Sequence, residues 1–156
     1  GVQIIGIDIN PECKQFEQGN IEIFIGSQDD EELLNNIIAK YPNVDVVLDD
    51  GSHMMRHMKK SFEVLYPKIS DNGVYAVEDT HTCYWEEYEG GLGKSDTFIE
   101  FAKFKIDEIN AIHSRNTVPV TDFTRSTDAI CFYDSVVVFE KRKQGYRQAP
   151  ITAPMP

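Results

Sequence analysis

The stretch VDVVLDDGSH, residues 44–53, decides the fold prediction for this chain. It opens with an apolar run of strand length, which ends in the paired acids Asp49 and Asp50 and then Gly51. Runs of the same kind occupy residues 3–8 (QIIGID), 21–25 (IEIFI) and 73–78 (GVYAVE). Each is short and apolar and is followed by acidic or turn-forming residues, so all of them are predicted to be buried β-strands.

Helical patterns lie between and after these strands. Over residues 30–41 leucine and isoleucine recur at helical spacing behind an acidic first turn, and Pro42 stops the pattern. A second helix is predicted over residues 55–66, and a third over residues 95–113, where isoleucines form one stripe. Alternating strands and helices indicate a mostly parallel sheet with right-handed crossovers and helices on both faces.

The C-terminal part of the chain adds an antiparallel hairpin to this sheet. Residues 129–133 and 135–141 are apolar runs separated by little more than Asp134, as in two strands joined by a tight turn. The fold class is therefore predicted to be α/β, a Rossmann-like three-layer sandwich whose sheet ends in an antiparallel pair. After residue 145 the chain becomes proline-rich and is expected to form a tail, residues 146–156.

The composition limits the classes of function. A chain of 156 residues with 41% apolar and 26% charged residues is the size and type of one globular domain. A net charge of −11 disfavours nucleic-acid partners, which are bound through Lys and Arg, and no apolar run is long enough for a membrane partner. The three cysteines show no CxxC spacing, so a reduced, cytoplasmic setting is expected.

Acids and amides follow each of the predicted parallel strands, and ligands of open α/β sheets bind outside the carboxyl ends of such strands. Asp8 ends the first strand, and Ser27 and Gln28 follow the second. Asp8 has the position at which nucleotide-binding folds place an acid to accept ribose hydroxyls. It can equally cap the turn before Pro11, and both interpretations remain open.

A divalent-metal site is predicted where the next two strands end. Asp49 and Asp50 on one strand and Glu78 and Asp79 on its neighbour bring together like charges that a cation would neutralise. Oxygen ligands favour Mg²⁺, with Mn²⁺ as an alternative. The competing explanation of these acids is that the aspartates only form turns. His53 follows directly and is a candidate general base.

A zinc site is the competing interpretation of the histidines. His53 and His57 are one helical turn apart, as in metalloprotease helices, but the glutamate of the HExxH motif is missing. His57, His81 and His113 are each expected to be ordinary helix or loop residues.

Four blocks resemble the macrolide sugar O-methyltransferases of the mycinamicin and tylosin type. They are GIDIN (residues 6–10), IGSQDD (25–30), LDDGSH (48–53) and VEDTHTCYW (77–85). The resemblance runs in order from residue 1 to about residue 141, and cephalosporin-hydroxylase-like proteins share a looser version. It implies the class I fold of methyltransferases that use S-adenosylmethionine, a cytoplasmic enzyme of antibiotic biosynthesis, and a small-molecule hydroxyl acceptor.

The resemblance also implies a role for particular residues. S-adenosylmethionine and Mg²⁺ (or Mn²⁺) would be the cofactors, and His53 would be the base that removes the proton of the acceptor hydroxyl. The remaining implied contacts are Asp50, Glu78 and Asp79 to the metal; Asp8, Ser27, Gln28 and Asp49 to the cofactor; and Tyr84 and Trp85 to the substrate.

One departure from the family pattern affects the domain prediction. The family's first strand and glycine-rich cofactor loop should precede the GIDIN strand, which here begins the chain. Residues 1–145 are therefore expected to be an N-terminally truncated methyltransferase domain. Unpaired strand edges would be left at the place of the absent strand, so another segment or a homo-oligomer is expected to fill it.

Two alternatives to an active methyltransferase remain. The chain can be an inactive or fragmentary methyltransferase-like binding protein, because the cofactor loop is not present. It can also be a metal-dependent oxygenase of the cephalosporin-hydroxylase-like group, which would need an iron site of two histidines and one carboxylate.

Overall fold

The computed structural model describes residues 1–143 and residue 145, and the predicted tail at residues 146–156 lies outside the described residues. The strands are β1 (Ile4–Asp8), β2 (Ile21–Ile25), β3 (Val46–Asp49), β4 (Val74–Val77), β5 (Thr127–Tyr133) and β6 (Val136–Lys141). The α-helices are α1 (Glu31–Lys40), α2 (Met55–Leu65), α3 (Phe98–Ile109) and α4 (Asp122–Ser126). Short 3-10 helices are η1 (Pro11–Phe16), η2 (Tyr66–Lys68), η3 (Thr80–Tyr84), η4 (Glu86–Tyr88) and η5 (Ala111–His113).

The strands form an α/β arrangement of mixed direction. β1 pairs with β2 in parallel, and β3 pairs with β4 in parallel. β6 is antiparallel to both β4 and β5, which gives the order β3-β4-β6-β5. The predicted parallel strands and the predicted C-terminal hairpin are therefore confirmed.

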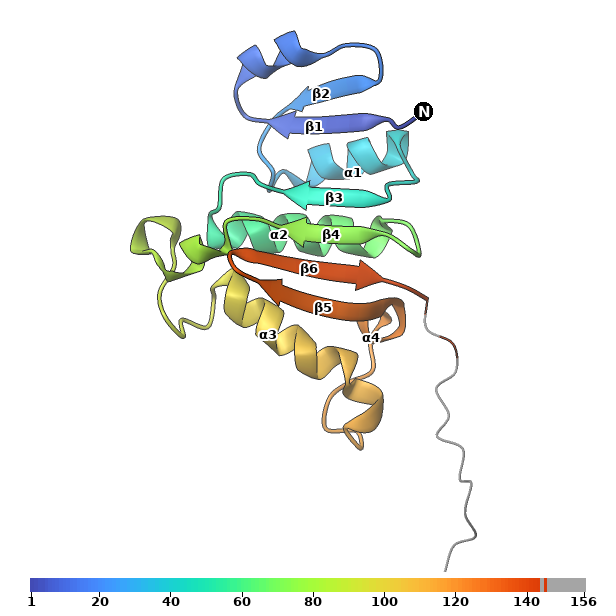
Figure 1. Ribbon diagram of the computed structural model, residues 1–156, viewed down its shortest axis with the longest axis vertical. Coiled ribbons are helices and arrows are strands. Elements are labelled where there is room, and N and C mark those ends of the chain that lie inside the picture. Colours follow the sequence, from blue (N-terminus) through green and yellow to red (C-terminus); the bar gives the residue numbers. More distant parts are fainter. Residues whose placement is uncertain (144, 146–156) are drawn as a thin grey trace, which may run out of the picture.

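The β1–β2 pair and the four-stranded sheet are not joined by strand pairing in the described residues. In Figure 1, β1 and β3 lie side by side and point the same way. A cavity of about 710 Å³ separates them, lined by Ile5 and Ile7 on one side and by Val46 and Leu48 on the other. The expected absence of a strand at this place in the sheet is thus seen among the described residues.

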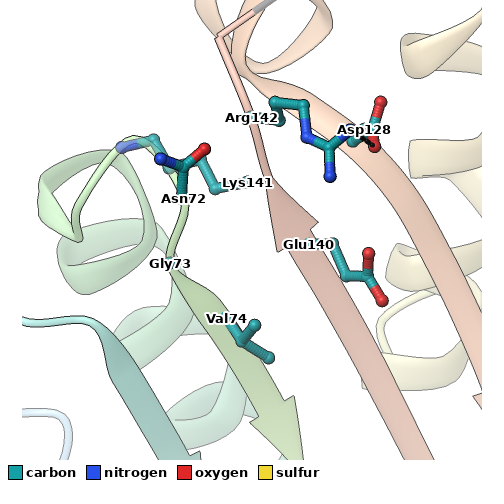
Figure 2. Close-up of a pocket in the computed structure, with 7 residues that line it drawn as sticks. All are labelled: Asn72, Gly73, Val74, Asp128, Glu140, Lys141 and Arg142. Carbon is teal, nitrogen blue, oxygen red and sulfur yellow. Dashed lines mark ion pairs between the residues drawn. The ribbon is translucent and has the colours of Figure 1, made fainter.

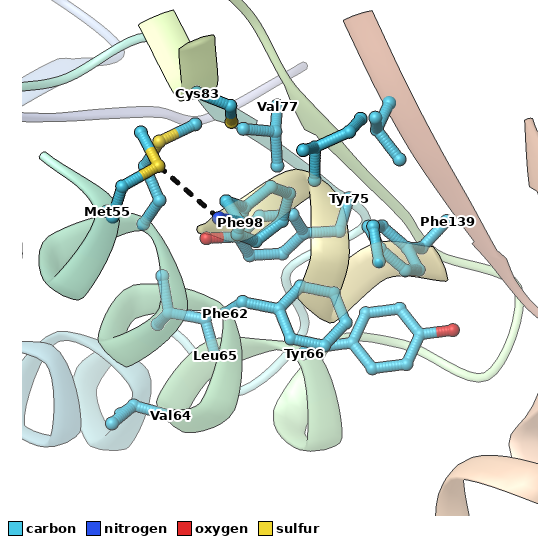
Figure 3. Close-up of a cluster of buried hydrophobic side chains, with 14 of the residues drawn as sticks. Met55, Phe62, Val64, Leu65, Tyr66, Tyr75, Val77, Cys83, Phe98 and Phe139 are labelled. Atoms are coloured by element: carbon cyan, nitrogen blue, oxygen red, sulfur yellow. Dashed lines mark hydrogen bonds between the residues drawn. The ribbon is translucent and has the colours of Figure 1, made fainter. Parts of the chain in front are cut away.

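The core lies between the four-stranded sheet and the helices on one of its faces. Phe62 of α2 is its centre, with ring centroids 5.1 Å from Tyr75 of β4 and 4.5 Å from Phe139 of β6. Phe98 of α3 packs 6.2 Å from Phe62, and its backbone N–H donates to the sulfur of Met55 (Figure 3). Each buried side chain of this size contributes roughly 1.5–3 kcal/mol to stability, so this cluster fixes α2 and α3 on the sheet.

The opposite face of this sheet is less covered than the alternating pattern led us to expect. Val46 and Leu48 point away from Val47 and Asp49 because side chains alternate along a strand. They are 66% and 59% exposed. Among the described residues, the α-helices therefore cover the four-stranded sheet on one face.

Local signals explain where the helices begin. The side chain of Asp30 accepts a hydrogen bond from the backbone of Leu33 at the first turn of α1. The side chain of Thr97 does the same for Glu100 in α3. Caps of this kind satisfy backbone N–H groups that have no partner inside the helix, and each is typically worth about 1 kcal/mol.

Within the described part of the chain, no helix combines the length and the apolar character needed to cross a membrane. Cys13, Cys83 and Cys131 are all free thiols.

Candidate metal and methyl-transfer site

The predicted site residues lie on one edge of the molecule, because the parallel strands end there. The arrowheads of β1, β2, β3 and β4 point to the same side in Figure 1. Asp8 and Asp49 are the last residues of β1 and β3, and the segment after β4 begins with Glu78 and Asp79. The prediction that the strand ends gather these polar residues at one edge agrees with this topology.

Three of these side chains form a group that can hold a cation. Asp50, His53 and Asp79 each offer one ligand atom, and these atoms all lie within 4.8 Å of one another. The Nε2 atom of His53 is 3.8 Å from a carboxylate oxygen of Asp79. Mg²⁺ holds oxygen ligands at about 2.0–2.1 Å and Ca²⁺ at about 2.3–2.6 Å, so ligands of one ion lie at most roughly 4–5 Å apart. The two carboxylates and the spacing of the group therefore fit a hard divalent ion.

The composition of this group differs from two of the alternatives. It contains one histidine, whereas the iron site of an oxygenase needs two. His57 is not part of this group, and its ring nitrogens lie beside Ser52 and Asp29. Glu78 is also outside the group, and its backbone N–H donates to the carbonyl of Asp49 at 2.9 Å. A metal-ligand role for Glu78 stays a prediction.

Both His53 and Asp79 have left-handed backbone conformations, with φ of 58° and 52°. Residues with a Cβ rarely adopt this region, and holding one there costs about 1–3 kcal/mol. Such strain persists only where surrounding contacts maintain it, and it is concentrated at functional sites. Two strained residues in one three-residue group support a functional role for that group.

The residue before Asp50 in the chain, Asp49, is a buried carboxylate. Asp49 is 8% exposed and accepts hydrogen bonds from the amide of Gln28 at 2.8 Å, from Ser61 at 2.6 Å and from Tyr75 at 3.0 Å. Burial and the negative charge of Asp49 raise the pKa of Tyr75 well above its usual value. The phenol therefore stays a donor to Asp49.

Gln28 connects this network to the loop that carries the metal-binding candidates. Its Oε1 atom accepts a hydrogen bond from the backbone N–H of Ser52 at 2.5 Å. A Cβ atom at residue 51 would clash with this oxygen, so a side chain there would require the Gln28 amide to move. The lack of a side chain at residue 51 leaves room for Gln28, which joins the segment after β2 to the turn after β3.

The other cofactor candidates make local contacts. Asp8 is exposed and accepts a hydrogen bond from the backbone of Asn10 at 2.7 Å, which lowers the pKa of its carboxyl group. The side chain of Asn10 then caps η1. Ser27 donates to Asp29. Asp8 therefore has the turn-stabilising role that we considered, and its contact to a ribose stays a prediction.

Aromatic rings border the group on the side of η3 and η4. Tyr84 and Trp85 are 48% and 45% exposed. The ring of Tyr88 lies 6.1 Å from that of His53, and 6.0 Å from that of Trp85. His81 lies 4.7 Å from Trp85 and shares a hydrogen bond with Ser135 at 2.6 Å. Sequence reasoning missed Tyr88 and His81, although the aromatic run of residues 84–88 was a signal for the first.

A second pocket lies where β4 begins and β6 ends, away from the carboxyl ends of the parallel strands (Figure 2). It holds about 70 Å³, and Arg142 and Asp128 form an ion pair at its wall. The buried amine of Lys141 donates to the carbonyls of Pro67 and Ile69. These contacts hold neighbouring chain segments together. The pocket itself has room for a few water molecules.

The sequence matches no protein-family model, but it is similar to several characterised enzymes. Demethylmacrocin O-methyltransferase of Streptomyces fradiae is 37% identical over 109 residues, which are 68% of this chain and 27% of that protein. Mycinamicin VI 2''-O-methyltransferase of Micromonospora griseorubida is 38% identical over 110 residues, 69% of this chain and 27% of that protein. The chain thus spans about a quarter of the length of these relatives.

The fold is similar to that of a solved methyltransferase. The MycE methyltransferase from the mycinamycin biosynthetic pathway, in complex with Mg, SAH and mycinamycin VI, superposes with a TM-score of 0.85. The identity is 30%, and the match covers 99% of this chain and 40% of that one. By sequence and by fold, the chain is a homologue of the macrolide sugar O-methyltransferases.

Proposed function

We propose that this chain carries the metal and cofactor sites of an O-methyltransferase that transfers a methyl group from S-adenosylmethionine to a hydroxyl of a sugar or similar small molecule. The observation that carries the proposal is the group of Asp50, His53 and Asp79 at the carboxyl ends of parallel strands. The relatives named above support it, because they are sugar O-methyltransferases and MycE was solved with Mg and SAH.

The chemistry assigns a separate task to each side chain. S-adenosylmethionine would supply the methyl group, and Mg²⁺ bound by Asp50 and Asp79 would lower the pKa of a hydroxyl beside it. Nε2 of His53 accepts the proton of that hydroxyl, and Asp79, 3.8 Å away, stabilises the imidazolium that forms. The freed oxygen then forms the new bond to carbon while the carbon–sulfur bond breaks, and no covalent intermediate with the protein is needed.

The cofactor contacts are proposed for Asp8, Ser27, Gln28 and Asp49. Gln28 and Asp49 line the 710 Å³ cavity between β1 and β3, which reaches the edge where Asp50 lies. Their mutual hydrogen bond of 2.8 Å orients both side chains. Glu78 is proposed as a further metal ligand.

The exposed aromatic rings are proposed to bind the acceptor. Trp85 lies 6.0 Å from Tyr88, whose ring lies 6.1 Å from that of His53. Tyr84 and Trp85 are both partly exposed, and exposed apolar surfaces often mark binding sites. A sugar ring has apolar faces that can lie against an indole or phenol ring, while its hydroxyls remain free to reach the metal. This arrangement suits a small-molecule glycoside within the methyltransferase domain that we propose for residues 1–145.

Replacing His53 with alanine tests this proposal. Loss of a general base lowers turnover by about 10²–10⁴-fold, here for methyl transfer to mycinamicin VI. His113→Ala, in η5 and outside the group, is the matched control and should keep full turnover. Unchanged turnover in His53→Ala would remove this residue from the mechanism.

Metal titration of the same variant separates a base from a ligand. If His53 acts only as a base, Mn²⁺ affinity measured by calorimetry should stay close to that of the unaltered protein. A loss of affinity and turnover together would make His53 a ligand. If the unaltered protein binds neither Mg²⁺ nor SAH, the proposed function is wrong.

A further inference from the structure

Ser52 lies in the turn between Asp50 and His53 and is restrained there by hydrogen bonds. Its backbone N–H donates to Gln28 at 2.5 Å, and its side-chain oxygen is 2.8 Å from Nδ1 of His57. The same oxygen accepts from the backbone N–H of Met54 at 3.4 Å. Both sides of the residue are therefore held, although Ser52 itself is exposed.

His57 is held in turn by a carboxylate from another loop. Its Nε2 atom is 3.3 Å from Asp29, and its side chain is only 15% exposed. The hydrogen bond from the Ser27 hydroxyl holds the pKa of Asp29 below its usual value, so Asp29 is ionised at neutral pH. An ionised Asp29 at 3.3 Å from Nε2 favours the tautomer with the proton on Nε2, and in this tautomer Nδ1 accepts a hydrogen bond from the Ser52 hydroxyl.

In this tautomer the Met54 N–H donates to Ser52 and the Ser52 hydroxyl donates to His57, whose Nε2 lies 3.3 Å from a carboxylate oxygen of Asp29. The Ser52 oxygen thus both accepts and donates a hydrogen bond, and the two bonds together resist rotation of the Ser52 side chain. Neither His57 nor Ser52 nor Asp29 belongs to the group that can hold a cation.

We propose that His57 is a positioning residue which, through Ser52, fixes the turn of Asp50 and His53 in the geometry that binds the metal. The inference rests on the proposed function, since it assumes that the group binds a cation. His53 has a φ of 58°, a conformation that residues with a Cβ rarely adopt, so contacts that restrain the turn help to maintain it.

A structural explanation for the same contacts predicts a different result. If His57 only stabilised α2, its removal would lower the melting temperature and leave the affinity for metal unchanged. If it positions the turn, its removal lowers the affinity, because outer contacts of metal ligands are typically worth about 10–100-fold.

The test is calorimetric titration of the chain with Mn²⁺. We expect His57→Ala and Ser52→Ala each to weaken binding by about tenfold or more. The double variant should be no weaker than either single one, because both changes break the same series of bonds. His57→Asn keeps an acceptor near the position of Nδ1, and it should recover most of the affinity. His113→Ala is the control and should bind like the unaltered chain.

Amide hydrogen exchange of the metal-free chain gives a readout that does not depend on metal. The amides of Ser52 and Met54 should exchange faster in His57→Ala, and those of β4 should not change. Mn²⁺ affinity in His57→Ala equal to that of the unaltered chain would overturn the inference, as would a His57→Asn variant no better than alanine. Failure of the unaltered chain to bind Mn²⁺ would instead overturn the proposed function.

Discussion

Replacing Asp50 with asparagine should stabilise the metal-free protein and abolish its response to metal. The substitution keeps the shape of the side chain and removes one of two carboxylates whose ligand atoms lie within 4.8 Å. Without a cation these charges repel one another. A site that binds metal through clustered acids is therefore a local source of instability until the metal arrives.

The magnitude follows from that separation. At 4.8 Å two unit charges repel by about 0.9 kcal/mol at the dielectric constant of water, and by about 3.5 kcal/mol at an effective value of 20. Asp50 is exposed and the side chain of Asp79 is 49% exposed, so the lower figure applies. A gain of about 1 kcal/mol raises the melting temperature of a domain of this size by roughly 2–4 °C.

Addition of metal should reverse which of the two proteins has the higher melting temperature. Mg²⁺ at a hundred times its dissociation constant stabilises the unaltered protein by about 2.7 kcal/mol, while the variant gains almost nothing. Thermal melts followed by circular dichroism would compare both proteins in excess chelator and in excess Mg²⁺ at low salt. Asp134→Asn, in the turn between β5 and β6, is the matched control for the loss of a negative charge.

Two outcomes would refute this reasoning. The first is that Asp50→Asn and Asp134→Asn have the same melting temperature in excess chelator. The carboxylates of Asp50 and Asp79 would then not repel one another as their distance requires. If the variant is stabilised by Mg²⁺ as much as the unaltered protein, Asp50 is not a ligand.

Two further predictions concern side chains of the core. Burial raises the pKa of Tyr66 to about 12, so the stability that this phenol contributes is complete below pH 10 and is lost as the pH rises towards 12. That difference corresponds to roughly 2.7 kcal/mol, and Tyr66→Phe should move alkaline unfolding, followed by circular dichroism, to higher pH. Cys83 is fully buried, and burial raises the pKa of its thiol. A thiol reagent should modify Cys13 and Cys131 in the folded protein, and Cys83 only when denaturant is added; modification of Cys83 at a comparable rate would contradict its burial.

The elements could be predicted because each is encoded within its own residues. The helix predicted over residues 30–41 is α1, and the strands predicted from apolar runs lie within a few residues of β1 to β6. The helix predicted over residues 95–113 ends at Ile109 and continues as η5. Apolar periodicity determines the type of an element well, and its ends depend on capping side chains such as Thr97.

The layers were predicted less well, because they depend on contacts between distant segments. The alternation of strands and helices indicated helices on both faces of the sheet. The structure places Val47 against the core and leaves Val46 and Leu48 exposed. Apolar residues in a strand show that a face can be buried, but they do not show what buries it.

The carboxylates of the site could be predicted from their positions at strand ends, and the contacts that hold them could not. Gln28 reaches Ser52 across 24 positions of sequence, and Tyr75 reaches Asp49 across 26. His57 was expected to be an ordinary helix residue, yet it bonds to Ser52 and lies beside Asp29. Spacing along one helix gave no sign of these partners, because they come from other loops.

The left-handed backbone conformation of His53 helps to explain the residues of the sequence DDGSH, which the motif alone did not explain. A glycine would adopt a φ of 58° at the position of His53 without strain, but it would carry no imidazole. The chain places its glycine two positions earlier, where Gln28 needs the space, and holds the strained histidine through the neighbouring Ser52. The need for a side chain at His53 and the room for Gln28 beside Gly51 are thus consistent with this order of residues, and with the outer contacts that we propose for His57.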